Sequence, residues 1–194
     1  MDLRLGFLAS GNGSNARDII EEIKSKRLEA KVRVIISENV NAKILELAVA
    51  ERIVSYRVNY NEHFEEKVAE ILGNYDVNIV ILSGFLKKIG ETLLSKYKNR
   101  ILNIHPALLP KYGGARMYGM KVHEAVIKSN DEYSGATVHL VNENYDDGRI
   151  LGKIMVPRYA EDNADDLCKR VRLAEKKFYP EILRRIERGQ IVLD

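Results

Sequence analysis

The sequence has a single cysteine, Cys168, and no tryptophan among its 194 residues. One thiol cannot form an intramolecular disulfide, and no group of cysteines and histidines has the spacing of a zinc site. No apolar run approaches the roughly 20 residues that cross a membrane, and Met1–Leu5 lacks the charged start and apolar stretch of a signal peptide. We therefore expect a cytoplasmic protein with no membrane segment and no bound metal.

The sequence also lacks a strong excess of charge of either sign. The net charge is +3, and 31 lysines and arginines are interspersed with 28 aspartates and glutamates. A nucleic-acid-binding protein concentrates its basic residues on one face, so we expect no nucleic-acid partner and interpret Arg184, Arg185 and Arg188 as a solvated helix face. The weak positive balance is compatible with an anionic small-molecule substrate but does not require one.

Short apolar runs alternate with helical periodicity through the first half of the chain. The expected strands are Leu3–Ala9, Val32–Ile36, Ile53–Val58, Val77–Leu82 and Ile101–Ile104, and the expected helices are Ala16–Lys26, Ala42–Arg52, Phe64–Leu72 and Ile89–Tyr97. This order predicts an α/β fold with a doubly wound, mostly parallel sheet and helices on both faces.

The pattern changes after this repeat. Ala136–Val141 and Leu151–Val156 are predicted strands on either side of a turn-rich segment, Asn142–Arg149, and we expect them to extend the sheet as an antiparallel pair. A long C-terminal helix should follow. Its predicted buried stripe is Leu167, Val171, Ala174, Phe178 and Ile182.

Pro180 interrupts the pattern of that C-terminal helix. A proline inside a helix lacks the N–H donor and clashes with the preceding turn, so we expect Pro180 to kink the helix or to start a second segment. No linker, repeat or low-complexity stretch divides residues 1–194. We therefore expect one domain.

A glycine-containing loop, Ser10–Asn15 (SGNGSN), lies between the first predicted strand and the first predicted helix. Its glycines allow close approach to a ligand and positive φ, and a helix N-terminus offers free N–H groups and partial positive charge to a phosphate. Gly11, Gly13 and Ala16, with Glu38 as the ribose acid, also fit a loose dinucleotide fingerprint. A tight turn with a helix cap explains the loop as well, so this motif alone leaves three interpretations open.

Asn103 and His105 lie in the segment Ile101–Pro110 (ILNIHPALLP), at the carboxyl end of a predicted strand. Open α/β sheets bind ligands beyond such ends, and residues two apart on a strand point to the same side. An amide donor beside an imidazole suits a reaction that passes through an oxyanion. The competing interpretation is a turn whose polar groups satisfy only the backbone. Tyr145–Gly148 (YDDG) has the composition of a turn, and most such turns are inert.

Taken in order, these motifs resemble the phosphoribosylglycinamide formyltransferase family. The matching residues cover nearly the whole chain and are Ser10–Asn15, Ser83–Phe85 (SGF), Asn103–Pro110 (NIHPALLP), Tyr145–Gly148, Glu175 and Tyr179–Pro180. The family transfers the formyl group of 10-formyltetrahydrofolate to the amine of 5-phosphoribosylglycinamide in purine biosynthesis, through a tetrahedral intermediate. The resemblance implies a Rossmann-like formyltransferase fold over residues 1–194, a folate co-substrate, no metal, small-molecule partners, and a monomer or homodimer.

The resemblance also implies roles for individual residues. Catalysis would rest on Asn103, on His105 as proton donor or oxyanion stabiliser, and on Asp146, which would raise the His105 pKa and organise a proton-transfer water. The nucleotide-binding residues would be Gly13, Ser14, Asn15, Arg172, Leu173, Ala174 and Glu175, with Glu175 on the ribose. The folate-binding residues would be Leu86, Lys87, Lys88, Ile89, Asn103, Asn142, Glu143, Asn144, Tyr145 and Asp146.

Some positions depart from the family pattern. Asp147 stands where many members have glycine, Asn61 stands where some have an arginine near the folate tail, and Ala115-Arg116 replaces an expected Lys-Gly. Two histidines have no assigned role in the site. His139 alternates with apolar neighbours and points either into the site or into the sheet packing, whereas His123 is interpreted as structural or solvated.

Three other functions are alternatives to formyl transfer to phosphoribosylglycinamide. Methionyl-tRNA formyltransferase shares the Asn-x-His-Pro chemistry but carries a further RNA-binding domain, and formyltetrahydrofolate deformylase carries an extra N-terminal domain, so we expect neither. A nucleotide-binding module without catalysis would need the Ser10–Asn15 loop but not Asn103, His105 and Asp146 together.

Overall fold

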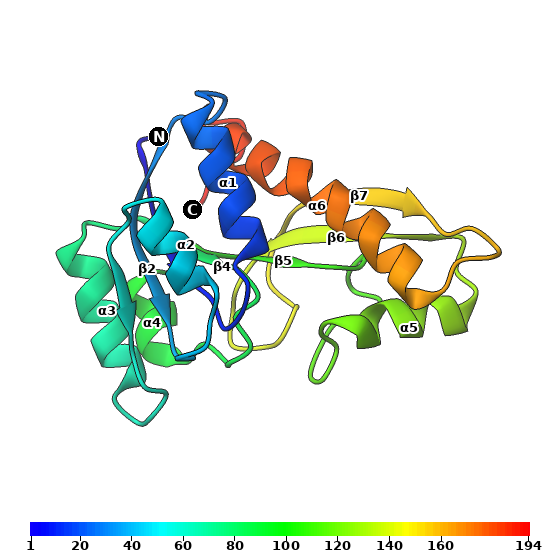
Figure 1. Cartoon of the computed structure of the whole chain (residues 1–194), viewed down its shortest axis with the longest axis horizontal. Coiled ribbons are helices and arrows are strands. Elements are labelled where there is room, and N and C mark those ends of the chain that lie inside the picture. The colour runs from blue at the N-terminus through cyan, green and yellow to red at the C-terminus, as the bar shows by residue number, and fades with distance from the viewer.

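A seven-stranded sheet forms the centre of the computed structural model, which describes residues 1–194 (Figure 1). Its strand order is β3-β2-β1-β4-β5-β6-β7. The first five of these strands are parallel, whereas β6 runs antiparallel to β5 and β7 runs antiparallel to β6. The strands are β1 (Leu3–Leu8), β2 (Ala30–Ser37), β3 (Ser55–Arg57), β4 (Ile79–Leu82), β5 (Ile101–His105), β6 (Tyr133–Leu140) and β7 (Ile150–Pro157). The predicted parallel sheet with an antiparallel extension is confirmed.

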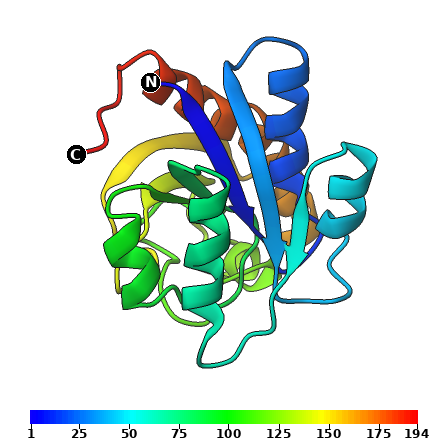
Figure 2. The ribbon, with the colours of Figure 1, turned by 90° about the vertical axis from the view of Figure 1, so that its left-hand side faces the viewer.

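Helices cover both faces of this sheet. They are α1 (Ser14–Lys24), α2 (Ile44–Ala50), α3 (Phe64–Asn74), α4 (Glu91–Lys96), α5 (Met120–Ser129) and α6 (Ala164–Glu187). Because strand side chains alternate between faces, Leu5 and Phe7 of β1 pack in the core with α1, α2 and α6, whereas Leu8 packs with α3 and α4. Figure 2 shows the two layers, with α1 and α2 on one side of β1 and β2 and with α3 and α4 on the other.

The topology reverses direction at β1, which pairs with β2 on one side and with β4 on the other. In an open α/β sheet such a switch point creates a crevice beyond the carboxyl ends of the strands. Here the segments after the two strands are joined, because Ser10 N donates to Gly84 O at 3.3 Å and Ala16 N donates to Ser83 Oγ at 3.2 Å. The fold therefore brings the Ser10–Asn15 loop and the SGF motif to one place.

The long C-terminal helix is a single element. Pro180 lies inside α6, so the expectation that it starts a second segment is wrong. The proline removes one backbone hydrogen bond, but Pro180 is buried, and Tyr179 beside it donates its hydroxyl to Leu102 O at 3.0 Å. Tertiary packing at this point outweighs the local cost.

The buried face of α6 also differs from the predicted stripe. Leu167, Val171 and Ile182 are buried as expected, whereas Ala174 and Phe178 are only half-buried. The other buried residues of this helix are Glu175, Tyr179, Pro180, Leu183 and Ile186. A buried carboxyl group in this row points to a function for Glu175 other than packing. None of the helices combines the length and hydropathy of a membrane-spanning segment.

Candidate active site

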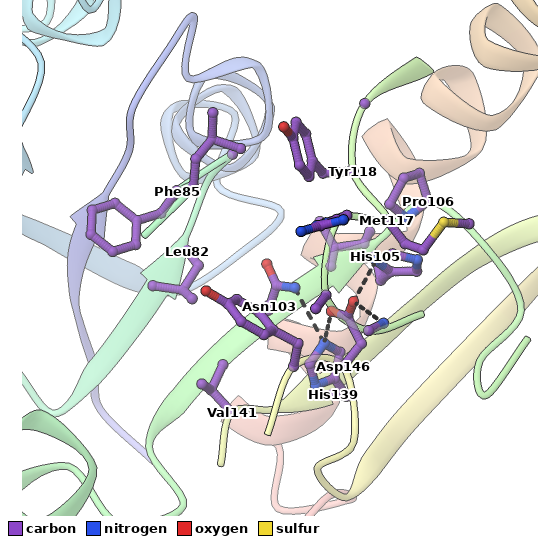
Figure 3. Close-up of a pocket in the computed structure, with 18 of the residues that line it drawn as sticks. Leu82, Phe85, Asn103, His105, Pro106, Met117, Tyr118, His139, Val141 and Asp146 are labelled. Atoms are coloured by element: carbon purple, nitrogen blue, oxygen red, sulfur yellow. Dashed lines mark hydrogen bonds and ion pairs between the residues drawn. The ribbon is translucent and has the colours of Figure 1, made fainter. Parts of the chain in front are cut away.

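A cavity of about 530 Å³ opens at the carboxyl ends of β4 and β5 (Figure 3). Its wall is built from the start of α1, the segments that follow β4 and β5, the turn between β6 and β7, and one face of α6. The volume falls within the usual range for a small-molecule site. Asn103, His105 and Asp146 all line it, so the structure brings together the three residues that the sequence proposed for catalysis.

Asp146 reaches the cavity because the turn before β7 is held tightly against the sheet. The residue has a positive φ of 57°. A Cβ added to Gly148 would overlap the carbonyl oxygen of Leu140, so only glycine permits this close approach. The Asp146 carboxylate accepts a hydrogen bond from Gly114 N at 3.0 Å, which ties the turn to the segment after β5.

His105 lies between two oxygen acceptors and is 4% exposed. Its Nε2 donates to the carbonyl of Tyr112 at 2.7 Å, and its Nδ1 lies 3.3 Å from Asp146 Oδ2. Burial lowers the pKa of His105 below its ordinary value, and the Asp146 carboxylate and the Tyr112 carbonyl partly offset that effect. Asp146 thus raises the pKa of His105, as predicted, but burial has the larger effect and the net pKa is lowered.

His139 is the neighbour of Asn103 across the β5–β6 ladder, and both side chains point into the site (Figure 3). His139 Nδ1 lies 2.9 Å from the carbonyl of Leu140, to which it donates, and Asn103 Nδ2 lies 3.2 Å from His139 Nε2. His139 Nε2 also lies 3.6 Å from Asp146 Oδ1. Of the two orientations left open for His139, the structure therefore has the one that faces the site.

Asp146 has a pKa below its ordinary value. Burial of the carboxyl group acts to raise it, but the nearby His139 ring, the charge of His105 and the N–H of Gly114 together lower the pKa of Asp146. The carboxylate therefore stays ionised at neutral pH while its side chain is only 11% exposed. It is a fixed negative charge between two imidazoles.

The Ser10–Asn15 loop has the form of an anion site. Gly13 adopts φ 64° before α1, and no side chain caps the helix. Asn15 lines the cavity, whereas Gly13 and Ser14 do not belong to its lining. The loop is held from outside, because Asn39 Nδ2 donates to Ser10 O at 2.9 Å and Ile44 N donates to Gly11 O at 3.2 Å.

Arg172 of α6 joins this loop to a buried acidic pair. Its guanidinium donates to Asn15 Oδ1 at 2.9 Å and to Asp18, and it lies 3.6 Å from Glu175 Oε2. Glu175 is 7% exposed. Burial raises the pKa of Glu175 to about 7, Arg172 lowers it and Asp18 raises it further. A carboxyl group poised near neutrality faces the cavity here.

The segments predicted to bind folate form another part of the wall. Leu86–Ile89 follow β4, and Leu86 N donates to Ser10 Oγ at 2.9 Å, which fixes the start of this segment. Asn142, Asn144 and Tyr145 line the cavity from the turn before β7. The extra charge of Asp147 lies next to amides, because Asn142 Nδ2 and Asn144 Nδ2 lie 3.4 Å and 3.3 Å from its Oδ2.

The structure does not bring every predicted residue to the cavity. Glu143, Leu173 and Ala174 lie outside the lining, and Leu173 is 68% exposed on the outer face of α6. Conversely, the lining includes residues that the sequence did not assign to the site. They are Leu82, Gly84, Phe85, Ile104, Pro106, Gly114, Ala115, Arg116, Met117, Tyr118, Gly119, His123, His139, Val141, Cys168 and Val171. No group of three or more histidine, cysteine, aspartate or glutamate side chains is arranged to hold a metal ion.

The sequence and the fold are similar to those of a known class of enzyme. The chain belongs to the formyl transferase family, whose model matches residues 3–183. Its relatives include phosphoribosylglycinamide formyltransferase of Escherichia coli (strain K12), which is 31% identical in an alignment of 186 residues that covers 93% of this chain and 85% of the relative. The chloroplastic enzyme of the same name from Arabidopsis thaliana is 38% identical over 93% of this chain, which spans 64% of that relative's length.

A solved structure agrees with these relatives. The crystal structure of glycinamide ribonucleotide transformylase 1 from Symbiobacterium toebii superposes with a TM-score of 0.91 at 30% identity, and the match covers 100% of this chain and 91% of that chain. The branch of the family that the chain resembles is therefore phosphoribosylglycinamide formyltransferase, as the sequence motifs indicate.

Proposed function

We propose that this chain transfers the formyl group of 10-formyltetrahydrofolate to the amine of 5-phosphoribosylglycinamide, giving formylglycinamide ribonucleotide and tetrahydrofolate in de novo purine biosynthesis. The observation that carries the proposal is the single cavity in which Asn103, His105 and Asp146 lie between the N-terminus of α1 and the Leu86–Ile89 segment. An anion site and a site whose wall is partly apolar thus meet at one polar centre.

Direct attack of the amine on the formyl carbon passes through a tetrahedral intermediate with negative charge on oxygen. Asn103 Nδ2 carries two hydrogens and points one of them toward His139 Nε2. The second hydrogen is available to the developing oxyanion, where a preorganised donor stabilises the transition state more than the ground state. His139 thus fixes the orientation in which the Asn103 amide works.

His105 and Asp146 supply charge and proton handling beside that donor. An imidazolium at His105 is satisfied by both the Tyr112 carbonyl and Asp146, and it places positive charge near the oxyanion. The amine loses a proton during the reaction and the folate nitrogen gains one. Asp146 supports this exchange, directly or through water, because it stays ionised within reach of two histidines.

Glycinamide ribonucleotide occupies the end of the cavity formed by α1 and α6. Gly13, Ser14 and Asn15 hold the phosphate with the partial positive charge of the helix N-terminus. Glu175 accepts from the ribose hydroxyls, and Arg172 holds this acid and Asn15 in place. Leu173 and Ala174 do not line the cavity, and their part is to keep Arg172 and Glu175 one turn apart on α6.

The folate occupies the other end. Leu86–Ile89 and Asn142–Asp146 offer backbone and amide groups to its polar ring, and the apolar wall includes Phe85 and Val141 (Figure 3). Lys87 and Lys88 add positive charge for the carboxylates of the folate tail. Glu143 does not line the cavity and only connects Asn142 to Asn144, which do.

The test is a formyl-transfer assay with glycinamide ribonucleotide and 10-formyltetrahydrofolate. Formylated nucleotide should appear only when both substrates and the protein are present. Parallel reactions with methionyl-tRNA as acceptor, and with no acceptor, distinguish the related chemistries. Product on the tRNA, or formate released without any acceptor, would replace this function with one of the two alternatives.

The same proposal includes the setting of the enzyme. Residues 1–194 act as one formyltransferase domain, as a monomer or homodimer in the cytoplasm, on small-molecule substrates and without a metal ion. Size-exclusion chromatography with light scattering measures the oligomeric state. Full activity after dialysis against a chelator is the expected result for the metal.

A further inference from the structure

A third histidine of the cavity has no part in the chemistry described above. His123 lies in the first turns of α5, lines the cavity and is 3% exposed. The sequence pattern suggested a structural or solvated residue. The structure excludes a solvated ring and places a buried imidazole at the cavity wall.

The ring of His123 lacks a hydrogen-bond partner within the protein. Its Nδ1 is one of three buried side-chain polar atoms that have none, together with Glu38 Oε2 and Ser134 Oγ. Neither Glu38 nor Ser134 lines the cavity. Buried polar groups in folded proteins are nearly always paired, so each exception needs an explanation. A ligand in the cavity supplies one for His123 once the ring rotates, because Nδ1 itself has almost no accessible surface in the unliganded protein.

The other two imidazoles of the cavity are already engaged. His105 faces the Tyr112 carbonyl and Asp146, and His139 faces the Leu140 carbonyl and Asn103. His123 is therefore the imidazole whose ring can pair with a substrate without breaking a contact to the protein. Burial and the nearby His105 lower the pKa of His123, so its ring is neutral at pH 7 and offers one donor and one acceptor.

The position of His123 assigns it to the nucleotide. Helix α5 packs against α6, and α6 lines the cavity with Cys168, Val171, Arg172 and Glu175. The phosphate and the ribose already have partners of matching chemistry in the α1 N-terminus and Glu175. A neutral donor–acceptor ring matches the remaining polar part of the nucleotide, its glycinamide group, which has an amide N–H and a carbonyl.

We infer that His123 binds the glycinamide group of the nucleotide substrate and so determines specificity for a glycyl amide over ribose phosphates that lack it. This inference rests on the proposed function. A site built to hydrogen-bond a polar group rejects analogues without that group, because its own buried atom then stays unpaired. The apo protein tolerates the unpaired nitrogen, and the bound nucleotide satisfies it.

The experiment compares His123→Leu and His123→Gln with the wild type and with Ser134→Ala. Ser134→Ala is the matched control, because it removes a buried unpaired polar atom outside the cavity. Calorimetry measures the Kd of glycinamide ribonucleotide without folate and the Kd of a folate analogue without nucleotide. Thermal melting without ligand reports apo stability, and the assay with ribose 5-phosphate as competitor reports specificity.

His123→Leu should raise the nucleotide Kd about tenfold, leave the folate-analogue Kd unchanged, and leave the apo melting temperature equal to or above that of the wild type. His123→Gln should show a smaller rise in Kd, and ribose 5-phosphate should compete more effectively with the nucleotide in both variants. Ser134→Ala should bind like the wild type. A nucleotide Kd within twofold of wild type in both folded variants overturns the inference, including when their melting temperatures fall, because His123 is then a packing residue. If the wild type itself neither binds nor formylates the nucleotide, the proposed function fails instead.

Discussion

At the scale of single residues, the protonation of His105 is set by two opposed effects. A neutral ring that donates from Nε2 to Tyr112 turns the Nδ1 lone pair toward the Asp146 carboxylate, 3.3 Å away. A charged ring satisfies both oxygens, but burial disfavours the charge and lowers the pKa of His105 overall. Asp146 is the group that keeps the charged form accessible.

Replacing Asp146 by asparagine keeps the shape of the side chain and removes its charge. We expect the pKa of His105 to fall further, because Asp146 raises it in the native protein. We also expect kcat to fall on the order of 10² to 10⁴-fold, the usual range for acid–base assistance, with much less change in the KM for the nucleotide. NMR titration of the histidine ring and steady-state kinetics measure the two effects.

Asp147→Asn is the matched control for that experiment, since it removes the neighbouring charge of the same turn, and no contact joins Asp147 to His105 or His139. It should keep kcat near that of the wild type. Near-normal kcat and an unshifted His105 titration in Asp146→Asn would reduce Asp146 to a turn residue.

Sequence alone predicts side-chain orientation where the spacing of residues along a strand determines it. Asn103 and His105, two apart at a strand end, point to the same cavity as expected. His139 stayed undecided because a strand alternation says which residues share a face but not what covers that face. The position of His123 at the cavity was not predicted, because it depends on α5 packing beside α6, a long-range contact that no local pattern contains.

At the scale of elements, two irregular segments make the site. The turn before β7 carries Asp146, and the segment after β5 carries Gly114, whose N–H donates to Asp146 Oδ2 at 3.0 Å. Thr137 of β6 fixes the start of the latter segment, because its hydroxyl donates to Ala107 O at 2.7 Å and accepts from Leu109 N at 3.1 Å. A regular strand therefore fixes the start of one segment, and a hydrogen bond ties the second segment to the first.

Gly148→Ala tests how tightly the turn is held. A Cβ at this position would overlap the carbonyl oxygen of Leu140, a backbone atom that cannot rotate away. We expect a loss of about 2 kcal/mol or more in the free energy of unfolding and a drop in kcat, because Asp146 shifts with the turn. Urea denaturation and kinetics measure the two effects.

Gly73→Ala in α3 is the control, because its added Cβ would meet only the flexible end of Lys96. This variant should be as stable as the wild type or slightly more stable, since alanine favours a helix. A Gly148→Ala protein with wild-type stability and activity would show that the turn adapts and that the glycine is not required.

The elements themselves were predicted to different degrees. The buried strands and their parallel order follow from short apolar runs between helical segments. The prediction that Pro180 starts a second segment was wrong, because local propensity was weighed without the packing of its neighbour Tyr179 against β5. The buried stripe of α6 was misplaced at Ala174 and Phe178 because the sequence pattern treats Glu175 as a surface acid.

At the scale of the whole molecule, the switch point of the sheet gathers groups that are costly to bury. The cavity side of α6 holds Glu175, and burial raises the pKa of Glu175 to about 7. His105 and His123 are also buried, and burial lowers the pKa of each. Burying these groups makes the site less stable than an apolar core of the same size. Glu175 and the two histidines also have opposite effects on how the free energy of unfolding depends on pH.

Glu175 makes the folded state hold a proton that the unfolded state releases. Above the ordinary glutamate pKa of about 4.3, the unfolded chain is ionised here, whereas the folded protein stays protonated until about pH 7. The free energy of unfolding contributed by Glu175 is therefore largest at low pH and falls as pH rises through this window, by about 3 kcal/mol in total. The two histidines act in the opposite direction, since a lowered folded pKa means that stability is lost as pH falls below about 6.5.

Glu175→Gln isolates the contribution of the acid, because glutamine has nearly the same shape and does not titrate. The free energy of unfolding of the variant minus that of the wild type should grow by about 3 kcal/mol between about pH 5 and about pH 8, as measured by urea denaturation. Glu124→Gln is the control, since it makes the same chemical change at an exposed acid of α5. A flat difference for Glu175→Gln would mean that the native carboxyl titrates like an exposed one. At pH 8 Glu175→Gln should also bind the nucleotide more weakly than the wild type, because in the proposed complex the ionised carboxylate accepts from the ribose hydroxyls. The substitution thus raises the relative stability of the protein at high pH while it lowers its affinity for the nucleotide.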